Sequence, residues 1–90
     1  MLECRVTIVN TLGLHARAAA QLVRLANKFP CSITIRRDDN GLSANAKSIL
    51  SVLHLAAGYN VSISITADGE SETEGIAAIE ELFLEGFGEL

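Results

Sequence analysis

Cysteine, basic residues and long apolar runs are all scarce in this 90-residue chain. Its two cysteines, Cys4 and Cys31, are too few and too far apart in sequence for a zinc site or a disulfide framework, so we expect no metal and two buried, free thiols. The 7 Lys and Arg residues against 11 Asp and Glu residues give a formal net charge of -4. This balance disfavours a nucleic-acid-binding protein, because such proteins gain affinity by neutralising phosphates.

Sequence signals of membrane proteins and of nucleotide-binding proteins are also absent. No apolar run approaches the roughly twenty residues that cross a bilayer, and the N-terminal segment lacks the features of a signal peptide. We therefore expect a cytoplasmic protein without membrane insertion. The chain has neither a Walker motif nor a Gly-x-Gly-x-x-Gly run, so we expect no ATP binding and no cofactor.

The spacing of apolar residues predicts a single α+β domain over residues 1–90. Hydrophobic residues make up 49% of the chain, enough for one small core, and no repeat or linker divides it. Alternation with a period of two predicts strands over residues 2–9, 31–36, 42–46 and 61–67, with a turn at residues 38–41. Helical spacing predicts helices over residues 16–28 and 48–56 and a third from about residue 71. The order β-α-β-β-α-β-α then implies a four-stranded antiparallel sheet covered on one face by three helices.

The ends and core faces of the later helices can also be predicted. In the helix over residues 48–56, Gly58 is the expected stop, and four residues fall at core spacing: Ile49, Val52, Leu53 and Ala56. The sequence Ser-Glu-Thr-Glu at residues 71–74 has the form of a capping box, so we expect Ser71 to cap the third helix. Three carboxylates near that start are assigned to stabilising the helix dipole, not to acid-base chemistry: Glu70, Glu72 and Glu74.

The most informative feature is a histidine where a glycine-containing turn runs into the first helix. His15 is expected beside backbone N–H groups that have no intrahelical partner, at the positive end of the helix dipole, which suits the binding of an anion. Imidazole titrates near neutral pH, so one ring nitrogen can act as a nucleophile without a metal. Arg17 follows two residues later, and its guanidinium can grip phosphate oxygens. Together these groups suggest a histidine that becomes phosphorylated.

The sequence Gly-Leu-His-Ala-Arg at residues 13–17, the alanine-rich helix after it and Ala-Lys-Ser-Ile at residues 46–49 resemble the HPr family of the bacterial phosphotransferase system. The likeness covers essentially the whole chain and implies an open-faced β-sandwich. It implies that His15 carries a phosphoryl group on Nδ1, that Arg17 assists transfer and that Ser48 is a regulatory phosphorylation site. The implied partners are enzyme I as donor, enzyme IIA domains as acceptors and an HPr kinase/phosphorylase.

Two positions depart from that family pattern. Ala18 stands where many members have proline, and because alanine is the better helix former we expect no weakening of the site. Ser51 stands where many have glycine, and its effect on partner contacts is left open.

A docking surface is expected along the first helix. Arg17, Gln21, Arg24 and Lys28 share one face, which is either a solvated helix face or a basic strip for acidic partners. Leu50 is expected to point outward from the second helix and to form the apolar centre of the same interface. The residues assigned to partner binding are Ala16, Ala20, Arg24, Lys28 and Leu50, on a chain that we expect to be monomeric. His54, which has no reactive neighbours in sequence, is assigned a structural role.

The sequence therefore predicts a phosphoryl carrier without independent catalytic turnover. Two alternatives remain. The chain could belong to the nitrogen-related branch of the same family, since residues 82–89 resemble the endings seen there. It could also be a regulatory binding module that is not phosphorylated, although the presence of both His15 and Arg17 argues against this.

Overall fold

The computed structural model describes residues 1–90 and contains the predicted order of strands and helices. The elements are β1 (Leu2–Thr7), α1 (Ala16–Ala26), β2 (Ser32–Arg37), β3 (Ser43–Asn45), α2 (Ile49–His54), β4 (Ser62–Asp68) and α3 (Glu72–Leu84). A short 3-10 helix, η1 (Gly86–Gly88), follows α3. None of the helices combines the length and the apolarity needed to cross a membrane.

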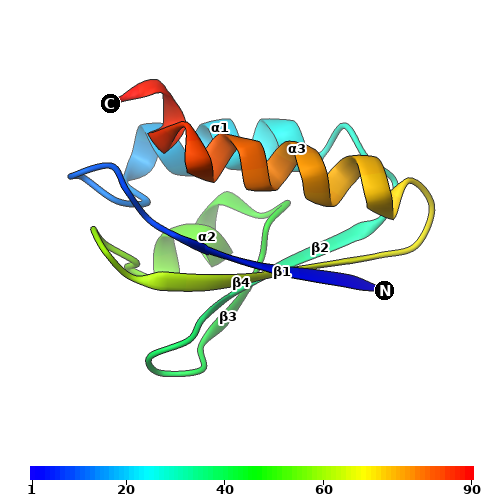
Figure 1. Ribbon diagram of the computed structural model, residues 1–90, viewed down its shortest axis with the longest axis horizontal. Helices are drawn as coiled ribbons and strands as arrows, with labels where there is room; N and C mark the ends of the chain where they lie inside the picture. Colours follow the sequence, from blue (N-terminus) through cyan, green and yellow to red (C-terminus); the bar gives the residue numbers. More distant parts are fainter.

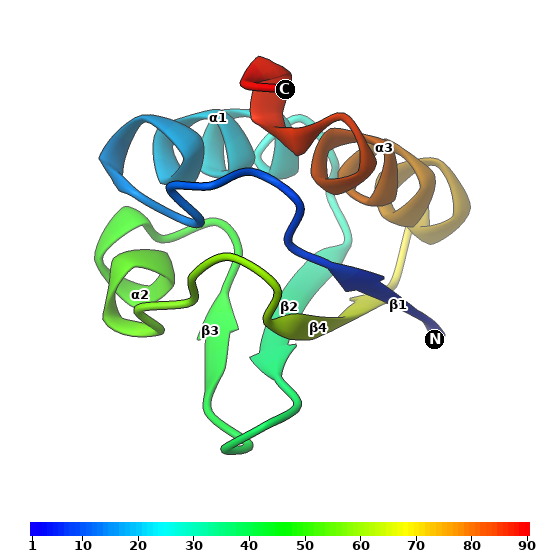
Figure 2. The ribbon, with the colours of Figure 1, turned by 60° about the vertical axis from the view of Figure 1, so that its left-hand side comes forward.

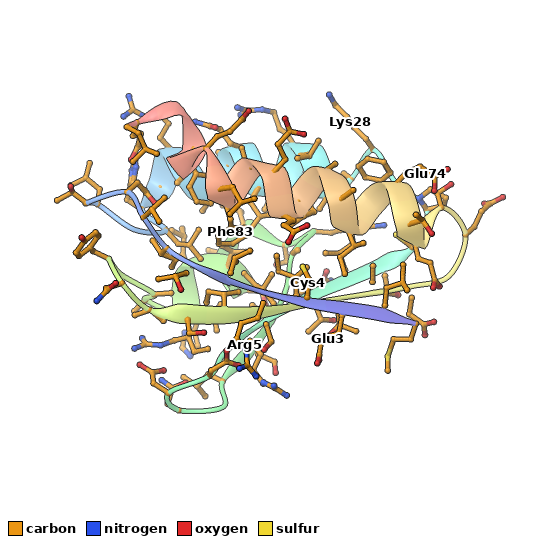
Figure 3. All side chains as sticks on the ribbon, viewed as in Figure 1. Glu3, Cys4, Arg5, Lys28, Glu74 and Phe83 are labelled. Carbon is orange, nitrogen blue, oxygen red and sulfur yellow. The ribbon has the colours of Figure 1, made fainter.

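The four strands form one antiparallel sheet in the order β1-β4-β2-β3. Helices α1 and α3 lie side by side over one face of this sheet, and the shorter α2 lies below α1 beside β3 (Figures 1 and 2). The opposite face carries no helix, and Glu3 and Arg5 of β1 project from it (Figure 3). The predicted α+β open-faced sandwich is therefore confirmed.

The hydrophobic core fills the space between the sheet and the helices. Alternate residues of the central strands point into it, as the period of two predicted, and Phe83 projects from α3 into the same layer (Figure 3). Burying each large side chain of this kind contributes roughly 1.5–3 kcal/mol. The fully buried side chains at the centre are Leu22, Ile33, Ile35, Ile63, Ile65, Ile79 and Phe83.

The prediction for the core face of α2 is wrong in most positions. Only Val52 of the four expected residues is buried, while Ile49 and Leu53 keep 37% and 36% of their surface exposed. The helix ends at His54, and Ala56, at φ 50°, takes the left-handed position expected of Gly58. A six-residue helix at the edge of the sheet presents too little surface to bury a full stripe, so Leu55 of the following turn completes its contact with the core.

The capping box expected at the start of α3 does not form. Ser71 lies at φ 64° in the left-handed region, and its side chain caps nothing. The Glu72 carboxylate instead accepts the Gly69 N–H at 3.0 Å, which lowers the pKa of Glu72 together with its contact to the chain's N-terminal amine. The side chain that accepts a backbone N–H near this helix start is therefore that of Glu72, not that of Ser71.

Both cysteines are free, with Cys31 buried and Cys4 only partly so. Strands β1 and β2 run parallel with β4 between them, so two strand spacings separate the cysteines. The register adds a further offset, because Cys4 pairs with Ile65 and Ile65 pairs with Ile35, not with Cys31. Two spacings of about 4.8 Å already exceed the reach of a disulfide.

Candidate functional site

His15 is the N-cap residue of α1, as the sequence predicted. Its backbone is extended, with φ -72° and ψ 178°, and its side chain makes no capping hydrogen bond. The imidazole is therefore available for other contacts, and the first N–H groups of the helix are left without intrahelical partners. With 25% of its side chain exposed, His15 is held in the surface but is still accessible.

The loop before His15 is pinned to the loop after α2. Gly13 has φ +64°, and a Cβ there would lie 2.6 Å from the carbonyl oxygen of Ala57, so only glycine fits. The next residue, Leu14, is buried and donates its N–H to the same oxygen at 2.9 Å. The buried Asn10 closes the loop by donating from Nδ2 to the Gly13 carbonyl at 2.9 Å. These contacts fix the direction from which the chain enters α1.

The C-terminal segment brings to His15 a carboxylate that no sequence pattern predicted. It returns over the start of α1 (Figures 1 and 2), where Glu89 Oε2 lies 2.5 Å from His15 Nε2 and 3.2 Å from Arg17 Nη2. The other oxygen, Oε1, accepts from Asn10 Nδ2 at 3.0 Å. The hydrogen bond from Asn10, followed by those from His15 and Arg17, holds the pKa of Glu89 below its usual value. Glu89 is therefore an ionised acceptor at neutral pH.

Phe87 anchors this C-terminal segment. Its ring is 2% exposed and packs edge-on against Phe83, with the ring centroids 5.0 Å apart. Gly86 and Gly88 on either side adopt φ 59° and 76°, so the Gly-Phe-Gly sequence was the one signal of a tight turn after α3. An open pocket that includes Arg17 and Glu89 is lined by Thr11, Leu12, Arg17, Gln21, Phe87, Gly88 and Glu89.

Ser48 is the N-cap residue of α2, again as predicted. Its Oγ accepts the Ser51 N–H at 3.4 Å, and the side chain is half-buried. The preceding Lys47 donates from Nζ to the carbonyl oxygen of Phe29 at 2.6 Å, which ties this corner to the end of α1. Leu50 is 77% exposed, so it points outward as expected.

The residues of the expected docking surface are on the outside of the molecule. Ala16, Arg24 and Lys28 are exposed, and Ala20 is half-buried. Helix α1 ends at Ala26, two residues earlier than predicted, so Lys28 lies in the following turn, where it extends away from the helical layer (Figure 3). His54 is an exposed residue at the end of α2. No group of three or more His, Cys, Asp or Glu side chains is placed to hold a metal ion.

An open-faced sandwich with a histidine at the start of its first helix is the arrangement of an HPr-like protein. Residues 2–85 match the family described as PTS HPr component phosphorylation site. The chain belongs to this family and is an HPr/NPr-type phosphocarrier of the phosphotransferase system.

Individual relatives resemble the chain over nearly its full length. Phosphocarrier protein HPr of Cupriavidus necator is 43% identical over 89 residues, which is 99% of this chain and 98% of that protein. Phosphocarrier protein NPr of Proteus mirabilis is 42% identical over 85 residues, 94% of this chain and 93% of that protein. The crystal structure of HPr-C-His from Thermoanaerobacter tengcongensis has a TM-score of 0.92 at 37% identity and covers 100% of this chain and 99% of its own.

Proposed function

We propose that His15 accepts a phosphoryl group from phosphorylated enzyme I and passes it to the histidine of an enzyme IIA domain. The observation that carries this proposal is the position of His15 at the N-cap of α1, accessible and with Arg17 two residues away. A phosphoryl group at this place would face the free N–H groups and the positive end of the helix dipole.

Transfer in both directions requires a phosphohistidine that is held only moderately. A charge at a helix end gains typically 0.3–1 kcal/mol from the dipole, which is small enough to leave the phosphoryl group transferable. Arg17 is 69% exposed and can move from Glu89 to phosphate oxygens without disturbing the core. In the transfer, a bond forms between phosphorus and Nδ1 of His15 while the donor's bond to phosphorus breaks, and the donor keeps that electron pair.

The docking surface for both partners comprises Ala16, Ala20, Arg24, Lys28 and Leu50. Ala16, Ala20 and Leu50 would supply an apolar contact area. Arg24 and Lys28 would face acidic groups on enzyme I and enzyme IIA. The protein would act as a monomer in the cytoplasm, and both partners would reach the same surface in turn.

Ser48 is proposed as a regulatory site for an HPr kinase/phosphorylase. Its place at the start of α2, next to the exposed Leu50, supports this. A phosphate there would place close to two negative charges within the docking surface and would repel an acidic enzyme I.

The nitrogen-related branch is the second candidate function. The relatives named HPr and NPr are similar to this chain at 43% and 42% identity, so identity alone does not separate the branches. Transfer to a sugar-specific enzyme IIA in preference to a nitrogen-related one would favour the sugar branch.

The central test is phosphorylation by phosphoenolpyruvate and a cognate enzyme I. Intact-mass analysis should find one phosphoryl group per chain, and this group should be lost in acid. His15→Ala should abolish the modification, whereas His54→Ala, which changes the other histidine, should retain it. A His15→Ala protein that is still labelled would overturn the assignment, and an unlabelled parent would favour the non-phosphorylated binding module.

A further inference from the structure

The contact between Glu89 and His15 determines which ring nitrogen carries the proton. A neutral imidazole has one N–H donor and one nitrogen with a free lone pair, and a hydrogen bond to either nitrogen selects the tautomer. An ionised carboxylate can only accept. Because Glu89 Oε2 lies 2.5 Å from Nε2, the proton must be on Nε2 and the lone pair on Nδ1.

The carboxylate is itself held in place by two further donors. Asn10 Nδ2 donates to Oε1 and Arg17 Nη2 donates to Oε2, at 3.0 and 3.2 Å. Only 13% of the Glu89 side chain is exposed, so these contacts are partly shielded from water. These three contacts fix the orientation of the carboxylate, so Oε2 stays against His15 Nε2.

Asn10 has only one amide orientation that fits. Its Nδ2 serves two acceptors, the Gly13 carbonyl and Glu89, and turning the amide over would set its oxygen against both. In the observed orientation the buried Oδ1 has no hydrogen-bond partner. Leaving such an atom unpaired costs about 1–3 kcal/mol, so the amide is retained here at a cost to stability. Asn10 thus links the loop before His15 to the Glu89 carboxylate.

Glu89 is also fixed through its backbone. Phe87, two residues before Glu89, is buried against Phe83. The side chain of Leu90 lies close to Gly86, where a Cβ would be 2.6 Å from Leu90 Cγ. The buried Phe87 therefore anchors the last turn and sets the Glu89 carboxylate over His15, while Leu90 on the other side of Glu89 keeps 78% of its surface exposed.

We propose that Glu89 is a positioning residue that keeps the proton of His15 on Nε2 and so presents the lone pair of Nδ1 for phosphoryl transfer. This role rests on the proposed function of His15 as the acceptor. When Nδ1 bonds to phosphorus and the donor leaves with its electron pair, Nε2 keeps its proton and the ring gains a positive charge. The Glu89 carboxylate then faces that charge, so the contact stabilises the phosphorylated ring as well as the correct tautomer.

The tautomer can be measured directly on the unphosphorylated protein. Nitrogen-15 NMR of labelled imidazole, at a pH where the ring is neutral, distinguishes the protonated nitrogen from the bare one. The parent should show Nε2 protonated throughout, and Glu89→Ala should show a mixture of both tautomers. Glu85→Ala is the matched control, since Glu85 carries the same charge in the same segment but is exposed. A Glu89→Ala protein with the tautomer of the parent would overturn the proposal.

Kinetics provide the second readout. Glu89→Ala should lower kcat for phosphorylation by enzyme I about tenfold, which corresponds to about 1.4 kcal/mol of barrier, with little change in KM. A faster reaction would show that the carboxylate blocks the acceptor site, and this too would overturn the proposal. If the parent protein accepts no phosphoryl group, the proposed function fails while the tautomer result stands on its own.

Discussion

Gly75 of α3 lies directly against Cys31, the residue before β2. A Cβ built on Gly75 would lie 3.0 Å from Cys31 Sγ, closer than such atoms normally approach. Phe29 and Ile33 would be 3.5 and 3.6 Å away, so the thiol cannot easily move aside. A glycine in the first turn of a helix, unfavourable by local propensity, is explained here by the close approach of α3 to Cys31.

Gly75→Ala should therefore destabilise the protein despite the better helix propensity of alanine. Propensity alone would gain about 1 kcal/mol, but overpacking a tight contact costs typically 1–3 kcal/mol. In a Cys31→Ala background the space is free, and the same substitution should become stabilising. Urea unfolding of the parent, the two single variants and the double variant measures this coupling. Equal effects of Gly75→Ala in both backgrounds would show that the two residues do not interact.

Arg17→Ala should slow phosphorylation of His15 while the acceptor stays intact. Loss of a charge-assisted hydrogen bond to the phosphoryl group predicts a decrease of about tenfold in rate. The endpoint should stay at one phosphoryl group per chain. Arg36→Ala is a suitable control, because Arg36 is partly exposed and forms an ion pair with Asp38, not with Glu89. Equal rates for Arg17→Ala and the control would remove Arg17 from the mechanism.

Ser48→Asp should reduce the rate at which enzyme I phosphorylates His15. One carboxylate imitates a phosphate only in part, so the deficit should be smaller than for true phosphoserine, and it should shrink at high salt because the repulsion is screened. Ser48→Ala separates charge from capping, since it removes the hydrogen bond to Ser51 without adding charge. If true phosphorylation of Ser48 leaves the rate at His15 unchanged, the serine is only a helix cap.

Asp38 should make the fold sensitive to acid. Its carboxylate accepts from Ser64 Oγ at 2.7 Å and from Ser62 Oγ at 2.9 Å, and Arg5 and Arg36 lie close to it. These contacts, the hydrogen bond from Ser64 first, hold the pKa of Asp38 below its usual value.

Because the pKa is lower in the folded state than in the unfolded chain, the stabilisation is present above the unfolded value of about 3.9 and is lost as the pH falls through the folded value. The free energy of unfolding of the parent should therefore decrease more steeply on acidification than that of Asp38→Asn. Urea titrations at several pH values test this. Parallel pH profiles for the two proteins would contradict it, and Ser64→Ala should give an intermediate profile.

The sheet and the start of α1 could be predicted from the sequence because both depend on local patterns. Ile33 and Ile35 alternate with polar residues, and this alternation reports directly which face is buried. Gly13 likewise marks the turn that sets His15 at the N-cap. In each case the residues that determine the structure are neighbours in sequence.

The core face of α2 and the carboxylate over His15 could not be predicted in the same way. Helical spacing shows that Ile49 and Leu53 share a side of the helix, but whether that side is covered depends on where a six-residue helix sits on the sheet. Glu89 lies 74 residues from His15, and no local pattern relates the two positions. Contacts of this kind become visible only once the whole chain is folded.

The pairing of β1 with β4 has a consequence for the order of folding. Leu2 pairs with Ala67, so during synthesis β1 has no partner until β4 has also been made. Closing so long a loop costs entropy before any contact is gained, and long-range pairing of this kind slows folding. Asn10 and His15 follow β1, while Glu89 follows α3, so the two halves of the site meet only when the ends of the chain come together. A nascent or partly folded chain would therefore expose a histidine whose tautomer is unselected, and the ability to carry phosphate would appear late, together with the last cooperative step of folding.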